Sequence, residues 1–164
     1  MKTRNLTISA VFMALGLVLH FLVPPAFFGV KPDFLLSMMF ISLMIVDDIK
    51  EAILIGIAGG IMSALTTSFP GGQIPNFIDK LISSTIIFYV IKTMKKNFSI
   101  RKVILIFALG TMLSGTIFLS VALGVTNQLN LFIASYPAVI IAMVVNAILG
   151  IFLYEATKRM KLLK

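Results

Sequence analysis

The sequence predicts an all-α membrane protein: a six-transmembrane-helix bundle in a single integral domain, residues 1–164. Hydrophobic residues make up 59% of the chain and charged residues only 12%, whereas about a quarter of the residues are charged in an average soluble domain. Six apolar segments are separated by connections that hold most of the charges. A chain in lipid must satisfy its own backbone hydrogen bonds, and the alternating pattern of barrel strands is absent, so helices are expected.

The six expected spans differ in length. They cover residues 6–23, 34–46, 52–65, 74–91, 103–125 and 131–154. The first and the last two reach the roughly 20 apolar residues that a membrane-crossing helix needs. The middle three are shorter or interrupted by polar residues, so we expect them to pack inside the bundle. The first span begins like a secretory signal, but its apolar run exceeds the roughly 7–15 residues of a signal core, and we interpret it as retained.

The placement of lysine and arginine predicts the orientation. Of the 14 basic residues, only Lys31 and Lys80 fall on one side of a six-span arrangement, and all others fall on the opposite side. Basic residues are enriched on the cytoplasmic side, so we expect a multi-pass cell-membrane protein with both termini in the cytoplasm. The net charge of +8 then reflects topology and contact with the headgroups of the lipid bilayer, and no nucleic-acid partner is expected.

Polar residues interrupt the apolar pattern on the expected outer side, above all in ALTTSFPGGQIPNFIDK, residues 64–80. Polar groups at membrane depth are tolerated where they line a cavity or are buried in protein. Asp79 and Lys80 offer one carboxylate and one ammonium, and Lys31 and Asp33 repeat that combination in the first outer connection. A zwitterion such as an amino acid needs both signs close together. The alternative is that each Lys–Asp pair neutralises itself at the interface.

The candidate substrate-binding residues combine these charges with amides, a hydroxyl and an aromatic ring. They are Lys31, Asp33, Thr67, Phe69, Gln73, Asn76, Asp79, Lys80 and Asn146. Phe27, Phe28 and Phe77 place further rings beside the charges. Asn146 is the only amide deep within a span, and the sequence leaves open whether it bonds across helices or faces a ligand. His20 ends the first span and is expected to be an interfacial hydrogen-bonding group.

Absent motifs argue against several function classes. The chain has no G-x-x-x-x-G-K-[ST] phosphate-binding loop, so it does not hydrolyse ATP by that route, and no nucleophile–base set suggests an enzyme. It has no cysteine and one histidine, so no histidine-cluster metal site is expected within a single chain. No metal and no cofactor are expected for this chain. No acidic residue is expected in mid-span, where an ion-coupled carrier usually keeps one. This argues against a carrier that works alone or as an oligomer without ATPases.

Small residues recur at helical spacing in four of the spans. The positions are Ala10 and Ala14 in the first span, Gly56 and Gly60 in the third, Gly110 and Ser114 in the fifth, and Ala134, Ala138, Ala142, Asn146 and Gly150 in the sixth. Such spacing lets helix backbones approach closely in lipid. For the fifth and sixth spans we expect packing within the monomer.

These features resemble a known family. Six spans with cytoplasmic termini, the Ala10-x-x-x-Ala14 pair and the absence of an ATPase motif resemble the substrate-binding (S) subunits of energy-coupling factor (ECF) transporters. Within that group, LHFLVPPAFFGVKPDFLLSMMF (residues 19–40) and residues 64–80 are similar to the TrpP-type tryptophan transport proteins. The resemblance implies capture of L-tryptophan from outside and delivery through a membrane coupling protein with two ATPases, which use the ATP. It also implies that Ala10 and Ala14 contact the coupling protein.

The residues themselves predict a less specific site, one for a zwitterion with aromatic walls. An indole would stack on phenylalanine rings and direct its N–H toward Gln73 or Asn76. One alternative is an S subunit for another small ligand. Another is a non-transporting membrane scaffold of the MreD type, although a scaffold would have no reason to keep opposite charges and amides together on its outer loops.

Overall fold

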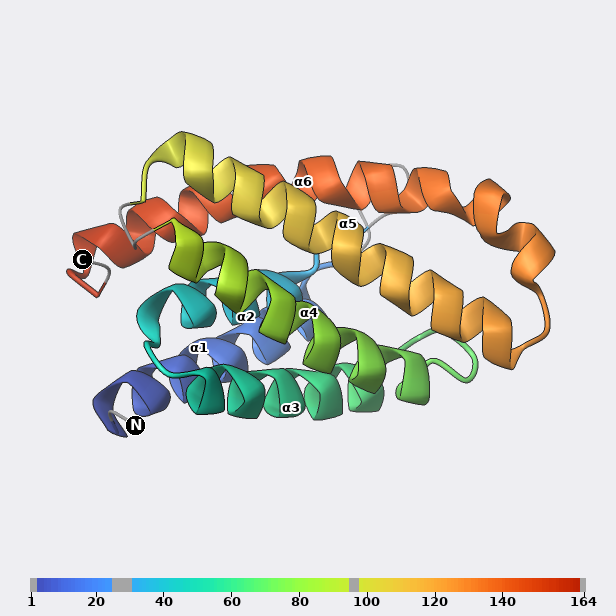
Figure 1. Ribbon diagram of the computed structural model, residues 1–164, viewed down its shortest axis with the longest axis horizontal. Helices are drawn as coiled ribbons and strands as arrows, with labels where there is room; N and C mark the ends of the chain where they lie inside the picture. Colours follow the sequence, from blue (N-terminus) through green and yellow to red (C-terminus); the bar gives the residue numbers. More distant parts are fainter. Residues whose placement is uncertain (1–2, 25–30, 95–97, 163–164) are drawn as a thin grey trace.

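The computed structural model describes residues 3–24, 31–94 and 98–162, which form a bundle of six α-helices (Figure 1). They are α1 (Thr3–Leu22), α2 (Phe34–Ile45), α3 (Ile49–Thr66), α4 (Gln73–Thr93), α5 (Ile100–Val125) and α6 (Phe132–Arg159), with a 3-10 turn, η1 (Leu129–Leu131), before α6. Five of these helices are long and apolar enough to cross a membrane, and α2 is shorter. The prediction of an all-helical bundle with six helices is confirmed for the described residues.

The surface of the bundle is apolar. Phe21, Ile133 and Phe152 expose 68%, 85% and 69% of their surface, and many other large aliphatic side chains are also exposed on the long helices. Burying such side chains in lipid removes apolar area from water, which is favourable. Together with the five helices that are long and apolar enough to cross a membrane, this surface identifies a multi-pass membrane protein.

The predicted spans agree with the helices to within five residues at either end. Some helices begin earlier than their apolar runs because a polar residue caps them. Asp48 accepts a hydrogen bond from the backbone N–H of Lys50 at 3.0 Å, and Ser99 accepts one from that of Lys102 at 3.5 Å, so α3 and α5 each start three residues before the predicted apolar run. The middle three segments were expected to be shorter or interrupted by polar residues: α2 has 12 residues, α3 has 18, and α4 has 21 with Asp79 and Lys80 inside it.

Helix α2 forms the centre of the bundle. Every residue from Leu35 to Ile45 is buried, and α2 contacts the five other helices. Gly110 on α5 lies directly against the ring of Phe40, and Gly150 on α6 against the ring of Phe107. These two rings meet edge to face at 5.5 Å. The expected packing role of small residues in the last two helices is therefore present at these two glycines.

Helices α3 and α4 form a tight antiparallel hairpin (Figure 1). Gly56 and Gly60 of α3 lie so close to Ser84 and Phe77 of α4 that a Cβ at either glycine would overlap these side chains. The turn between the helices requires another glycine, because Gly71 has a φ of 73°, which L-residues rarely adopt. The glycines in this part of the chain are thus explained by packing and by the turn.

The short length of α2 leaves space inside the bundle. Helix α1 begins and α6 ends at the same end of the bundle, and α2 lies toward that end (Figure 1). At 1.5 Å per residue, the 12 residues of α2 are about 18 Å long and the 26 residues of α5 about 39 Å. Helix α2 therefore fills only part of the length of the bundle, and a cavity lies beyond its first residue.

Candidate substrate-binding site

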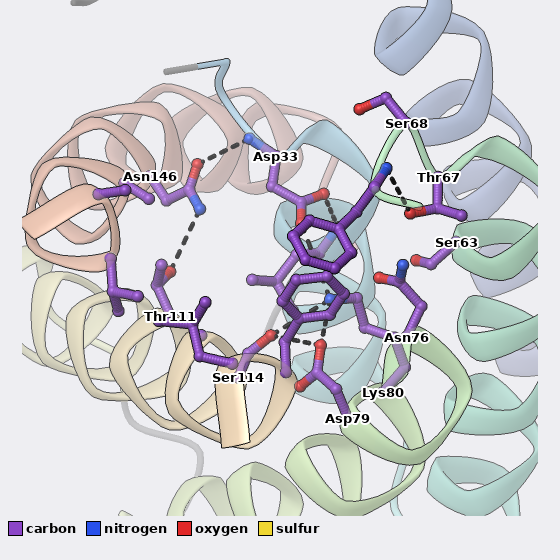
Figure 2. Close-up of a pocket in the computed structure, with 18 of the residues that line it drawn as sticks. Asp33, Ser63, Thr67, Ser68, Asn76, Asp79, Lys80, Thr111, Ser114 and Asn146 are labelled. Carbon is purple, nitrogen blue, oxygen red and sulfur yellow. Dashed lines mark hydrogen bonds and ion pairs between the residues drawn. The ribbon is translucent and has the colours of Figure 1, made fainter. Parts of the chain in front are cut away.

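A cavity of about 360 Å³ lies at the N-terminal end of α2 (Figure 2). Its volume falls within the roughly 300–1,000 Å³ of small-molecule sites. The lining combines polar and apolar residues from all six helices and from the connection after α3. They are His20, Asp33, Leu36, Ser63, Thr66, Thr67, Ser68, Phe69, Asn76, Asp79, Lys80, Thr111, Ser114, Gly115, Phe118, Leu119, Ser135, Ala138, Val139, Ala142 and Asn146.

A buried group of charges forms one wall of this cavity. Lys80 Nζ lies 2.6 Å from Asp79 Oδ2 and 3.2 Å from Ser114 Oγ, and the Ser114 hydroxyl donates to Asp79 Oδ2 at 2.8 Å. Asp33, at the start of α2, places its Oδ2 at 3.8 Å from the same ammonium. Figure 2 shows these four side chains converging from α2, α4 and α5. We call Asp33, Asp79, Lys80 and Ser114 the charge cluster.

The charges of α4 lie deeper than the sequence suggested. Because α4 begins at Gln73, Asp79 and Lys80 are about two turns inside the helix and are only 0% and 4% exposed. The expectation that no acidic residue lies inside a span is therefore wrong for Asp79. Burial of charges is tolerated because each is paired and hydrogen-bonded.

The sequence neighbours Lys31 and Asp33 do not pair with each other. The Lys31 ammonium donates to the backbone carbonyl of His20, and Lys31 is not part of the cavity lining. Asp33 instead caps α2, since its Oδ1 accepts from the backbone N–H of Leu36 at 2.9 Å, and it faces Lys80 and the imidazole of His20, whose Nδ1 is 3.9 Å from Asp33 Oδ1. The expected second Lys–Asp pair is thus replaced by a pair between α2 and α4.

Asn146 bonds across helices at the edge of the cavity. Its Oδ1 accepts from the backbone N–H of Asp33 at 2.9 Å, and its Nδ2 donates to Thr111 Oγ1 at 3.3 Å. The amide therefore joins α6 to the start of α2 and to α5 (Figure 2). Of the two roles left open by the sequence, the structure shows the cross-helix one, and a ligand contact stays a prediction.

The connection after α3 contributes hydroxyl, amide and aromatic groups. Thr67 Oγ1 accepts from the backbone N–H of Phe69 at 3.3 Å, and the Phe69 ring meets the Phe118 ring edge to face at 5.5 Å. Asn76 Nδ2 donates to the carbonyl of Gly72 at 2.8 Å. Thr67, Phe69 and Asn76 all line the cavity, and their contact with a ligand stays a prediction.

Other expected contributors lie elsewhere. Gln73 is exposed and is not part of the lining, so Asn76 is the predicted amide that borders the cavity near Phe69. Phe77 packs against Gly60 of α3 instead of lining the cavity. Phe27 and Phe28 lie outside the described residues.

Sequence reasoning missed several lining residues. Thr111, Ser114 and Phe118 repeat at intervals of three and four on α5 and share one face, a signal that was present in the sequence. Ala138 and Ala142 belong to the small-residue stripe that we expected to pack within the monomer, yet they border the cavity. The hydroxyls at the end of α3, such as Ser63, gave no distinguishing pattern. No cluster of three or more potential metal ligands occurs among the described residues.

Comparisons with known proteins identify the family. The family model described as "Tryptophan transporter TrpP" matches residues 2–162. The chain is 41% identical over 155 residues to a probable tryptophan transport protein of Bacillus subtilis, covering 94% of this chain and 90% of the relative. It is 36% identical over 161 residues to one of Clostridium acetobutylicum, covering 97% and 94%. No solved structure matches the chain. The chain belongs to the TrpP family of tryptophan transporters.

Proposed function

We propose that this chain captures L-tryptophan from the outside of the cell and is the S subunit of an ECF importer. It then delivers the ligand through a membrane coupling protein with two ATPases. The single observation that carries the capture step is the cavity, which combines the charge cluster with the phenylalanine rings of Phe69 and Phe118. In this one cavity, the charge cluster can bind the charged end of an amino acid such as tryptophan, and the phenylalanine rings can contact its aromatic end.

The neutral part of the cavity suits an indole. Aromatic rings prefer edge-to-face or offset contacts, and Phe69 and Phe118 present such surfaces. The indole N–H requires an acceptor. Asn76 uses its Nδ2 for the carbonyl of Gly72, which leaves its Oδ1 for the indole. A phenyl ring in the same place would leave that oxygen without a donor, which costs about 1–3 kcal/mol when the group is buried, so tryptophan is preferred to phenylalanine.

The coupling step is supported by one face of α1. Helix α1 buries Ser9, Phe12, Met13 and Gly16, whereas Ala10 and Ala14 are exposed. The chain also has no phosphate-binding loop of its own, so energy from ATP would have to come from partner subunits. The small side chains on the exposed face would let a helix of the coupling protein approach closely.

Ligand binding by the purified subunit tests the capture step. The chain contains no tryptophan, with 14 phenylalanines and 3 tyrosines, so excitation at the red edge of indole absorption reports added tryptophan. We expect a saturable shift of its emission to shorter wavelength without ATP or partners, because the indole moves from water into an apolar cavity. Ala142→Leu, which narrows the cavity, should weaken the shift, and Ala134→Leu, two turns away and outside the lining, should not.

Two outcomes would contradict the capture step as proposed. If folded protein gives neither an emission shift nor calorimetric heat with tryptophan, while another small molecule binds tightly, the ligand is wrong. If no compound in a broad panel binds, a scaffold without transport explains the chain better.

Labelling of single cysteines tests the orientation. We propose that both termini are cytoplasmic and that the cavity opens to the outside, since 12 of the 14 basic residues fall on the side of the six-span arrangement that holds both termini. Because the native chain has no cysteine, a membrane-impermeant maleimide should label Gly124→Cys in intact cells and Arg159→Cys only after permeabilisation. Gly124 is exposed with open space around it. Labelling of Arg159→Cys alone in intact cells would reverse the orientation.

A further inference from the structure

The ammonium of the charge cluster has little capacity left for a ligand. Lys80 Nζ donates to Asp79 Oδ2 and to Ser114 Oγ, at 2.6 and 3.2 Å, and Asp33 Oδ2 lies 3.8 Å away, within ion-pair distance but beyond a hydrogen bond. The lysine side chain is only 5% exposed. A ligand carboxylate would have to compete with two carboxylates for a donor that is almost closed off from the cavity.

The carboxylate oxygens of Asp33 and Asp79 make fewer hydrogen bonds than they can accept. Within the described residues, Asp33 Oδ1 accepts from the backbone N–H of Leu36, whereas Asp33 Oδ2 has the Lys80 ammonium at 3.8 Å, which is too long for a hydrogen bond. The Asp33 side chain is 31% exposed and lines the cavity. Asp79 Oδ1 is buried and has no hydrogen-bond partner in the structure.

The surroundings of Asp33 leave this carboxylate open to a cationic group. His20 Nδ1 is 3.9 Å from Asp33 Oδ1 and makes no hydrogen bond. The Lys31 ammonium is directed at the His20 carbonyl. Two carboxylates, Asp33 and Asp79, therefore share the single ammonium of Lys80 at the cavity wall, and the more accessible of the two has an oxygen free of hydrogen bonds.

We propose that the site recognises its ligand chiefly through a primary ammonium, held by the Asp33 carboxylate, and that Lys80 serves as the counter-ion of Asp79 without binding the ligand carboxylate. This inference deepens the proposed function and rests on it. The ligand class is then an aromatic primary amine, of which tryptophan is one member. A ligand carboxylate, where present, is met by neutral donors such as the hydroxyls of Ser63 and Thr67, which line the same cavity.

Two tryptophan relatives that each lack one charged group test this inference. Tryptamine has the indole and the ammonium, and indole-3-propionate has the indole and the carboxylate. Binding of each to the purified full chain is measured by its own indole emission and by calorimetry. We expect tryptamine to bind within tenfold of tryptophan and indole-3-propionate at least a hundredfold more weakly, since a charged ligand group gains most from an accessible opposite charge with free hydrogen-bonding capacity.

A matched pair of variants locates the contact. Asp33→Asn keeps the volume and the capping oxygen for α2, because asparagine is an equally good N-cap, and removes only the charge. It should weaken both tryptophan and tryptamine more than tenfold, with thermal unfolding close to that of the native chain. Glu155→Gln makes the same chemical change outside the lining and should leave both affinities unchanged.

Each outcome separates this inference from the proposed function. If indole-3-propionate binds and tryptamine does not, the ammonium is not the chief determinant and the inference is wrong. The same holds if both relatives bind more weakly than tryptophan by the same factor. Unchanged tryptamine affinity in a folded Asp33→Asn chain would also overturn it. If tryptamine binds through Asp33 but tryptophan does not bind, the proposed ligand is wrong while the amine site stands. If none of the three binds, both proposals fall.

Discussion

Replacing Lys80 with methionine is expected to destabilise the folded chain by about 3–5 kcal/mol, the usual cost of leaving one partner of a buried ion pair alone. Asp79 is 0% exposed, and its bonds from Lys80 and Ser114 hold it in the core of the bundle. Methionine keeps much of the lysine stem but offers no charge. The carboxylate of Asp79 would then be buried with the hydroxyl of Ser114 as its remaining partner.

A double variant distinguishes a lost ion pair from lost packing. In Asp79→Asn/Lys80→Met no unpaired charge remains between α4 and α5, so we expect the double variant to be more stable than Lys80→Met. Replacing a buried ion pair by uncharged residues of similar volume is often neutral or stabilising. The measurement is the free energy of unfolding, or the midpoint temperature, of the purified chain in detergent.

Lys92→Met provides the control on the same helix. Lys92 is exposed in the last turn of α4, with its ammonium 5.8 Å from the centre of the Phe88 ring, and a cation–π contact at an exposed site is worth about 0.5–1 kcal/mol. Its replacement should therefore have a small effect. A Lys80→Met chain as stable as the native one, or an Asp79→Asn/Lys80→Met chain less stable than Lys80→Met, would contradict the cost of an unpaired Asp79 charge.

The helices were predictable because their signals are local. Most spans are largely apolar runs, and residues such as Asp48 and Ser99 mark where a helix begins. The central position of α2 could be predicted only in part from the sequence. Its short apolar run indicated an interior segment but not which helices surround it. The burial of every residue from Leu35 to Ile45 depends on how the other helices pack.

The charge cluster was not predictable as an arrangement. The sequence places Lys31 beside Asp33 and Asp79 beside Lys80, and both pairs looked equivalent. In the structure Lys31 turns to the carbonyl of His20, and Asp33 joins Lys80, 47 positions away along the chain. Such a pairing follows from where α2 starts relative to α4, and no local pattern contains that information.

The small-residue stripes show the same limit. Gly110 and Gly150 make room for the rings of Phe40 and Phe107, whereas Ala138 and Ala142 border a cavity. The spacing in the sequence is alike in both cases, because small residues serve close packing and open space equally well. Only the side chain presented by the facing helix decides between these two outcomes.

The second large effect is expected on the exposed face of α1. Ala10→Leu or Ala14→Leu should leave tryptophan binding by the purified subunit unchanged and reduce uptake by cells that hold the whole transporter more than tenfold. The added side chain would keep a helix of the coupling protein at a greater distance, since close approach requires small residues at this spacing. The helix itself should tolerate the change because leucine is a good helix former.

The geometry of α1 separates the two effects. His20 is the residue of α1 that lines the cavity, and Ala10 precedes it by ten residues, about 15 Å along a helix. Both alanines face away from the buried side of α1, which carries Phe12 and Met13. A leucine at either alanine can therefore affect the cavity only by rearranging α1. Such a rearrangement would be detected as a change in the affinity of the purified subunit for tryptophan.

Ala156→Leu is the matched control for this face. Ala156 is exposed near the end of α6, at the same end of the bundle as Ala10, and receives the same increase in volume. Uptake by this variant should equal that of the native chain. If Ala10→Leu and Ala14→Leu both transport normally at native expression levels, the exposed face of α1 does not contact a partner. Loss of binding in the purified variants would instead show that the leucines disturb the cavity, and the separation of capture from coupling on α1 would be wrong.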